Sequence, residues 1–264
     1  MTIVDALLLV VAGFFAGVVG FVTGLASLVS YPALLAVGLS PVAANVTNTV
    51  AMVGVGVGAL SNSAREVVDT GPRVWRWTAY AALGGLTGAV VLLVAPAGSF
   101  EATVPFLVAF ASLALLLQPK IRELAGGRDL PRVFAAALFV VAVYGGYFGA
   151  GAGVIFLALT LICTSESIWR ASILKSYLLG VANLVAAIGF AFFGPVHWIA
   201  AAAMAVGAFA GGWCGPPLVK RIPRRCCGSR WPSQVSVSPD GLPSVDSILQ
   251  VLQYGPRVTS ARRA

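Results

Sequence analysis

The chain has 264 residues, of which 59% are hydrophobic and 10% are charged, and its mean hydropathy is +0.93. Soluble domains carry charge on about 25% of their residues, so this composition excludes a soluble globular protein and predicts a chain embedded in a lipid bilayer. The net charge of +8 does not indicate a nucleic-acid partner, because the basic residues are spread between apolar segments and form no aromatic-flanked patch.

Continuous apolar segments follow one another along the chain, and segments of about 20 such residues can cross a bilayer as helices. They lack the alternating pattern of transmembrane barrel strands, so we predict an all-α, polytopic membrane helical bundle. The first segment has no Lys or Arg before it, which favours a retained helix over a cleaved secretory signal. The predicted spans are 3–24, 41–60, 74–97, 101–118, 131–150, 167–193 and 197–217.

Glycine-rich breaks interrupt this pattern twice, and each is followed by a short apolar piece, 25–38 or 153–163. Such pieces are either steep short helices or re-entrant halves, which are tolerated where they are buried in protein or line a cavity. The two breaks copy each other at one constant spacing, so the chain is an internal duplication, and paired interrupted segments indicate a transporter's binding site. The predicted helix-break glycines are Gly17, Gly20 and Gly24 in the first copy and Gly146, Gly149 and Gly153 in the second. Alternatively, these glycines serve only the close approach of helices.

The basic residues predict the orientation of the two copies. Lys and Arg gather in the loops at 65–76 and 120–132 and after residue 219, and such loops face the cytoplasm. A second matched pair of segments begins at Gly71-Pro72 and Gly194-Pro195, and only the first of these connections is basic. The copies are therefore expected to be inverted repeats. Each would then need an odd number of crossings, which is satisfied if the short pieces cross and 101–118 closes the first copy.

Lys175 lies inside the predicted span 167–193. An ammonium at bilayer depth costs several kcal/mol unless it is hydrated or paired, so we expect Lys175 to face the bundle interior. At about 100° per residue, Ser172, Lys175, Ser176 and Asn183 share one helix face. The span offers no neighbouring Asp or Glu, and a fixed cation without a protein partner favours an anionic ligand. Alternatively, Lys175 could lie near an interface and extend to water, or it could lose its proton during a transport cycle, since buried lysines change their protonation readily.

The equivalent helix of the first copy carries Asn45 and Asn48 at the positions of Ser172 and Lys175, with Thr47 on another face. Asn and Thr side chains donate and accept hydrogen bonds and could replace the water shell of a small oxyanion. They could equally bridge neighbouring helices. The predicted substrate-binding residues are Lys175, Asn45, Thr47, Asn48, Ser172, Ser176 and Asn183.

The sequence offers little for catalysis, a metal or a cofactor. The four cysteines form no C-x-x-C pair and have no histidine nearby, so no metal site is expected. An intramembrane lipid-modifying enzyme is the alternative of another class, but such chemistry needs clustered carboxylates, metal ligands or a base. No P-loop motif is present, so we expect a non-enzymatic secondary transporter without cofactors.

Three segments carry a resemblance to a known family. Residues 44–51 read ANVTNTVA, residues 144–153 read YGGYFGAGAG, and Leu174-Lys175 leads to Val181-Ala182-Asn183. Over about residues 5–225 the chain resembles the sulfite exporter (TauE/SafE) family of membrane permeases. The resemblance implies a multi-pass permease of a bacterial cell (plasma) membrane that moves a small anion, sulfite or an organosulfonate-type sulfur anion. Whether the protein forms a homo-oligomer is left undecided by the sequence.

The C-terminal part departs from this family. Residues 216–223 resemble the lead into a final membrane helix, yet a Ser-, Pro-, Gly- and Arg-rich sequence follows, which predicts disorder. Either the tail is native, or a reading-frame change near Arg224 replaced the closing helix and left an inactive or truncated permease. The expected organisation is a first membrane repeat 1–118, a cytoplasmic linker 119–130, a second membrane repeat 131–217 without its closing helix and a basic tail 218–264.

Overall fold

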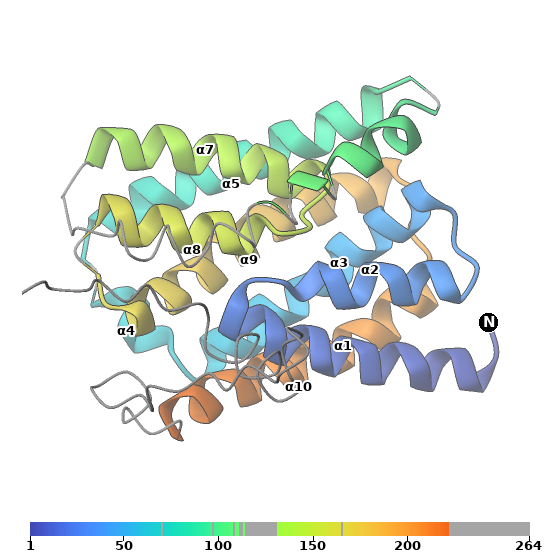
Figure 1. Ribbon diagram of the computed structural model, residues 1–264, viewed down its shortest axis with the longest axis horizontal. Coiled ribbons are helices and arrows are strands. Elements are labelled where there is room, and N and C mark those ends of the chain that lie inside the picture. Colours follow the sequence, from blue (N-terminus) through green and yellow to red (C-terminus); the bar gives the residue numbers. More distant parts are fainter. Residues whose placement is uncertain are drawn as a thin grey trace, which may run out of the picture. The chain divides into compact units, whose positions relative to one another are not determined.

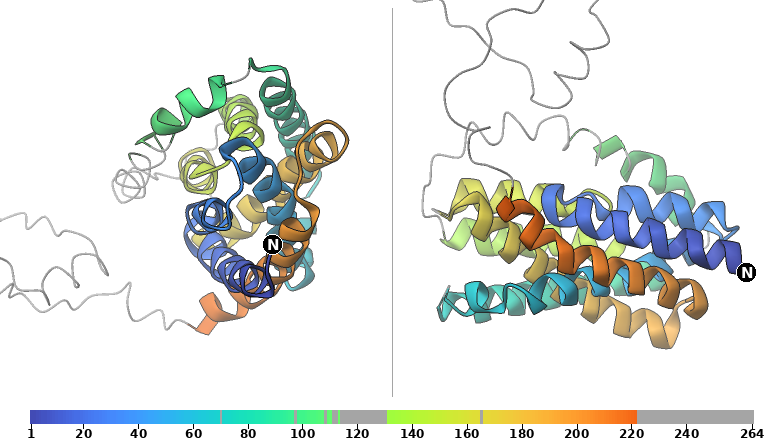
Figure 2. Two further views of the ribbon diagram at one scale, coloured as in Figure 1. Left: turned by 90° about the vertical axis from the view of Figure 1, so that its right-hand side faces the viewer. Right: turned by 90° about the horizontal axis from the view of Figure 1, so that it is seen from below.

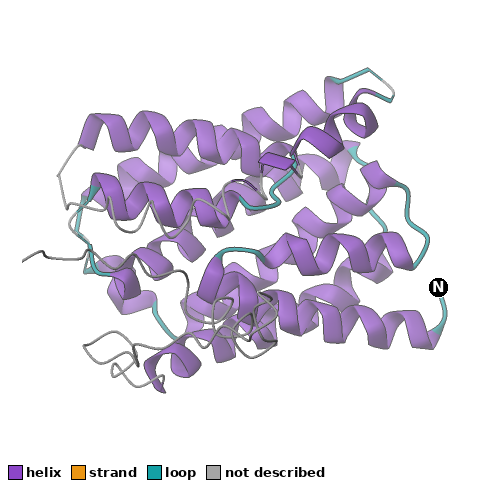
Figure 3. Ribbon diagram, in the orientation of Figure 1, coloured by secondary structure: helices purple, strands orange, loops and turns teal. Residues whose placement is uncertain are grey.

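The computed structural model describes residues 1–69, 71–96, 98–107, 109–110, 113, 131–164 and 166–221. These residues form helices joined by short loops, and no strand occurs among them (Figure 3). The all-α prediction is confirmed. The predicted linker 119–130, the tail beyond residue 221 and the proposed frame change near Arg224 lie outside the described residues.

The helices follow the predicted apolar segments closely (Figure 1). Five of those described are long and apolar enough to cross a membrane, namely α1, α3, α5, α9 and α10, and residues 99–107 are also helical. The short helix α4 was not predicted, because its sequence carries no apolar run. The bounds are α1 Ile3–Thr23, α2 Ala26–Ala36, α3 Pro41–Ser61, α4 Ala64–Val68, α5 Arg73–Val94, α7 Pro131–Tyr147, α8 Ala152–Cys163, α9 Ile168–Phe193 and α10 Trp198–Arg221.

Local side chains set where the central helices begin. The Ser40 hydroxyl accepts a hydrogen bond from the Ala43 amide at the start of α3, and Pro41 takes the first helical position. The Ser167 hydroxyl accepts one from the Arg170 amide at the start of α9. Serine at these positions satisfies amides that have no partner within the helix, which fixes the register of both helices.

The two short pieces form the returning arms of two hairpins. In Figure 1, α2 runs back toward the end of the bundle that holds the N-terminus, whereas α8 runs back toward the opposite end. These helices have 11 and 12 residues, or about 16–18 Å at 1.5 Å per residue, while the hydrocarbon core is about 30 Å thick. Their length favours the re-entrant alternative over the expected crossings. The inverted orientation of the copies stays a prediction.

Glycines bring the two copies into direct backbone contact. A Cβ atom on Gly211 would lie 3.0 Å from the Gly17 Cα, and one on Gly88 would lie 2.9 Å from the carbonyl carbon of Gly146. Gly17 and Gly146 therefore lie within α1 and α7, where they allow close helix packing, and not at the breaks as predicted. Side chains at these positions would separate the helices.

The breaks themselves meet at the centre of the bundle. α1 ends at Gly24, whose φ of 87° is left-handed, and the loop after α7 contains Gly149 with a φ of 80°. A Cβ on Gly153 would lie 2.7 Å from the Gly24 Cα. Gly20 occupies the last turn of α1 and Gly153 the first turn of α8, so both flank a break.

Most helix–helix contacts fall within two groups of helices, and each group mixes the copies. α1, α2, α3 and α10 form one group, while α5, α7, α8 and α9 form the other. Figure 2 shows α1 (blue) beside α10 (orange), the first and the last of these elements along the chain. The two groups meet chiefly along α3 and α9.

Several basic residues near helix ends lie at the same end of the bundle. Arg65 in α4 and Arg73 and Arg76 at the start of α5 lie at the end opposite the N-terminus (Figure 1). α4 contacts α9, which carries Arg170 in its first turn. This distribution agrees with a cytoplasmic location for that end, because cytoplasmic loops are enriched in Lys and Arg.

We predict that Gly207→Ala destabilises the protein, because a Cβ there would lie 2.8 Å from the Phe14 amide nitrogen of α1. Overpacking of this kind costs about 1–3 kcal/mol. The matched control is Gly189→Ala, whose Cβ would lie an ordinary 3.9 Å from the Ala89 Cβ. Thermal unfolding of the purified protein in detergent should show a lower melting temperature for Gly207→Ala alone. Equal melting temperatures would contradict the tight α1–α10 contact.

Candidate functional site

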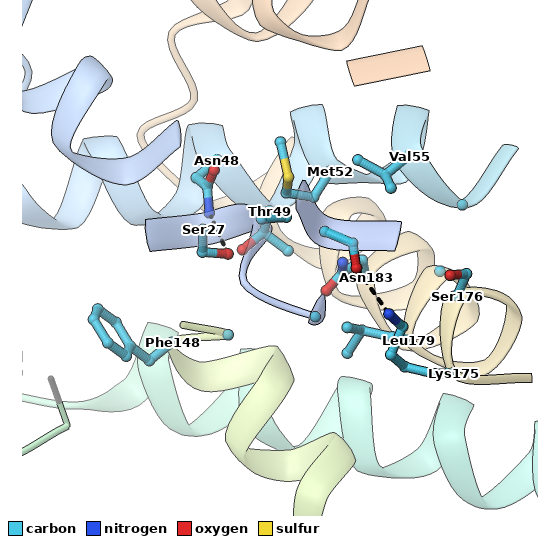
Figure 4. Close-up of a pocket in the computed structure, with 16 residues that line it drawn as sticks. Ser27, Asn48, Thr49, Met52, Val55, Phe148, Lys175, Ser176, Leu179 and Asn183 are labelled. Carbon is cyan, nitrogen blue, oxygen red and sulfur yellow. Dashed lines mark hydrogen bonds between the residues drawn. The ribbon is translucent and has the colours of Figure 1, made fainter. Parts of the chain in front are cut away.

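A cavity of about 40 Å³ lies where the breaks meet (Figure 4). One buried water needs about 10–15 Å³, so the space holds roughly three waters or one small ion. Gly24 and Gly149 of the two breaks border it. Its polar lining comprises Ser27, Asn48, Thr49, Lys175, Ser176 and Asn183, and its apolar side includes Met52, Val55, Phe148 and Leu179.

Lys175 is 1% exposed, so its predicted interior position is confirmed and the alternative of an interfacial lysine is wrong. Its Nζ donates hydrogen bonds to the carbonyl oxygens of Gly20, at 2.8 Å, and Phe21, at 2.7 Å. The same nitrogen lies 5.9 Å from the centre of the Phe21 ring. The expectation of a cation without a protein partner is therefore wrong, because α1 supplies partners that the sequence of α9 cannot reveal.

These contacts cap the C-terminal end of α1. The last four carbonyls of a helix lack partners within it, and the C-terminal end carries a partial negative charge. α1 has no basic residue in its own last turn. The Lys175 ammonium from α9 supplies a donor to the Phe21 carbonyl and a second donor to the Gly20 carbonyl, which also accepts from the Gly24 amide at 2.9 Å. Its positive charge opposes the partial negative charge of the helix end.

Asn45 has the corresponding role at the other break. It is fully buried, and its Nδ2 donates to the carbonyl oxygen of Tyr147, the last residue of α7, at 2.8 Å. Its Oδ1 has no hydrogen-bond partner among the described residues. α3 thus caps the broken helix of the second copy, as α9 caps that of the first. Asn45 lies outside the cavity lining.

Asn48 connects α2 to α3 beside the cavity. Its Nδ2 donates to the Ser27 hydroxyl at 3.2 Å, and the Ser30 hydroxyl donates to its Oδ1 at 2.5 Å. Ser27 and Ser30 were not among the predicted site residues. Their three-residue spacing within the apolar piece 25–38 was the available signal, since it places both on one helix face.

The other predicted residues divide between the cavity and its surroundings. Ser176 and Asn183 line the cavity together with Lys175 and Asn48. Ser172 and Thr47 lie outside the lining, like Asn45. The Thr47 hydroxyl accepts a hydrogen bond from the His197 amide at 3.0 Å, so it attaches the loop before α10 to α3.

The N-terminus of α2 also borders the cavity. The lining includes Ala26 and Ser27 of its first turn, and no side chain caps this 11-residue helix at its start. A helix N-terminus favours negative charge. In the described part of the chain, no three His, Cys, Asp or Glu side chains gather as a metal site would require, and the cavity lining described here contains no carboxylate.

Comparison with known proteins identifies the family. The sequence model described as "Sulfite exporter TauE/SafE" matches residues 9–227. The chain belongs to the TauE/SafE family. It is thus a multi-pass membrane transporter, and its family agrees with the resemblance drawn from the sequence.

Curated relatives of this TauE/SafE protein come from several bacteria. "Probable membrane transporter protein YfcA" of Escherichia coli K12 is 31% identical over 224 residues, which is 82% of each chain. "Probable membrane transporter protein ORF9" of Sinorhizobium sp is 28% identical over 210 residues, covering 78% of this chain and 80% of that protein. No solved structure matches the chain.

We predict that Asn45→Ala lowers the melting temperature more than Asn62→Ala. Both side chains donate to a backbone carbonyl, Asn45 to Tyr147 at 2.8 Å and Asn62 to Trp213 at 2.7 Å, but the first bond is partly buried and the second is exposed. Leaving a carbonyl that water reaches poorly without its donor costs up to about 1–3 kcal/mol, whereas water replaces the donor at an exposed carbonyl. Equal thermal shifts of the two purified variants would argue against a capping role for Asn45.

Proposed function

We propose that this TauE/SafE permease moves a small oxyanion, sulfite or an organosulfonate-type sulfur anion, by alternating access. The observation that supports this most directly is the buried ammonium of Lys175 on the wall of a central polar cavity. The two carbonyls that it binds are dipoles, so they stabilise its positive charge without cancelling it. An anion in the cavity would supply the opposite charge.

Neutral donors around the lysine would complete the site. The Asn48 and Asn183 amides and the Ser27, Thr49 and Ser176 hydroxyls face the same space, and amides and hydroxyls can donate to an anion's oxygens. In this structure the Thr49 and Ser176 hydroxyls donate to the carbonyls of Asn45 and Ser172, so they would have to rotate to bind an anion. These groups come from α2, α3 and α9 and thus from both copies. We propose them, with Lys175, as the substrate ligands. Asn45, Thr47 and Ser172 would hold helices together and would not contact the substrate.

The division of the bundle supports a rocking mechanism. The cavity lies where the group containing α3 meets the group containing α9, and transporters built from repeats commonly move one bundle against the other around a fixed site. The hydrogen bond from Lys175 to α1 and that from Asn45 to α7 both join the two groups. Relative motion would have to loosen these contacts, so opening at each end would be controlled by a different helix break.

We predict that Lys175→Met abolishes saturable uptake of radiolabelled sulfite into proteoliposomes. Removing one partner of a buried charge pair costs about 2 kcal/mol or more, which corresponds to a loss of at least about thirtyfold in flux at limiting substrate. A panel of sulfoacetate and other sulfonates, tested as competitors, would identify the preferred substrate.

The matched control is Arg170→Met on the same helix. Arg170 is paired with Glu166 at 3.5 Å, and its side chain is 39% exposed, so this variant removes one positive charge away from the cavity. Flux should persist in Arg170→Met. Normal flux in folded Lys175→Met would exclude the charge role, and a wild-type protein that moves none of these anions would favour the inactive-permease alternative.

We predict that Leu179→Ala shifts selectivity toward larger sulfonates. Leu179 belongs to the apolar side of a cavity of about 40 Å³, and its truncation creates room beside the polar groups without removing any of them. The ratio of sulfoacetate flux to sulfite flux in proteoliposomes should rise relative to wild type. An unchanged ratio, with both fluxes intact, would place the substrate elsewhere.

A further inference from the structure

We propose that Lys175 is a built-in cation occupying a monovalent-cation site at the C-terminal end of α1, so that the transport cycle needs no free Na⁺. The consequence for the cycle rests on the proposed anion transport. The cation site itself rests on the geometry around the end of α1 and can be tested without any substrate.

The ligands at this position are of kinds that bind a cation. The carbonyl oxygens of Gly20 and Phe21 converge on the Lys175 Nζ at 2.8 and 2.7 Å, and the Phe21 ring offers its π-system at 5.9 Å. In transporters with discontinuous helices, carbonyls at the C-terminal ends of half-helices coordinate Na⁺. Here an ammonium attached to α9 lies where a free ion would otherwise bind.

The backbone around the break keeps this site in place. Gly24 ends α1 in a left-handed conformation, and its amide donates to the Gly20 carbonyl at 2.9 Å. The backbone of Gly153 packs against Gly24. α1 therefore cannot extend to satisfy its last carbonyls, and the partial negative charge of its end stays buried beside the cavity.

The two copies differ at this point. The second break, at the end of α7, receives only the neutral amide of Asn45, and the position equivalent to Lys175 in the first copy is Asn48. One break thus has a full positive charge and the other has none. A bound monoanion and the Lys175 ammonium would together form a neutral pair, so no additional cation is needed to balance the substrate.

The test compares Lys175→Ala, which leaves space at the α1 end, with Lys175→Met, which fills that space with an apolar chain. Melting temperatures of the purified full-length proteins are measured without substrate in N-methyl-D-glucamine, Na⁺, K⁺ or propylammonium chloride at equal ionic strength. We expect Na⁺ or propylammonium to raise the melting temperature of Lys175→Ala saturably, since a ligand that binds only the folded state stabilises it. Wild type and Lys175→Met should respond equally to all four salts. Identical responses of Lys175→Ala and Lys175→Met would overturn the proposal.

A transport measurement on the wild-type protein keeps the proposal testable if Lys175→Ala does not fold. Sulfite flux into proteoliposomes should be equal in Na⁺ and N-methyl-D-glucamine buffers, and an absolute requirement for Na⁺ would overturn the built-in cation while leaving anion transport intact. Absence of sulfur-anion flux in every buffer, combined with saturable cation stabilisation of Lys175→Ala, would reject the proposed function and support the cation site.

Discussion

The contact between the Lys175 ammonium and the last carbonyls of α1 is the interaction on which the centre of this bundle depends. A helix that stops inside a membrane protein leaves carbonyls without donors and a partial negative charge at its end. Neither can be left unsatisfied where water is scarce. α9 solves both problems with one side chain, and this allows α1 to end beside a small polar cavity. In the proposed mechanism, the charge that stabilises the break would also attract an anion to the cavity.

The second copy has a corresponding contact at its own helix break, made by a neutral amide and not by a lysine. Asn45 of α3 donates to the end of α7, so each copy caps the broken helix of the other. Glycine contacts also join helices of different copies, α1 with α10 and α5 with α7. The broken helix of each copy therefore depends on a side chain of the other copy. In the proposed mechanism, the unequal caps, a lysine and an amide, would make the two breaks resist opening unequally.

The sequence predicted what depends on local composition and periodicity. Apolar runs located the long helices, matched glycines located the breaks, and the cost of a buried ammonium placed Lys175 in the interior. Helical periodicity indicates which residues share a face but not what that face contacts. The sequence therefore could not show that Lys175 meets carbonyls of α1, that Asn45 binds α7 instead of lining the cavity, or that Ser27 faces Asn48. Gly17 and Gly146 show the same limit, because a glycine pattern does not distinguish a break from a close packing contact.

The pairing of α1 with α10 has a consequence for biosynthesis. Translation at about 5–20 residues per second leaves roughly 10–35 s between completion of the first helix and synthesis of its partner. During this interval the small-residue face of α1 has only lipid or the insertion machinery as a neighbour. The contact between α1 and α10 can therefore form only late, after all the intervening helices have been synthesised.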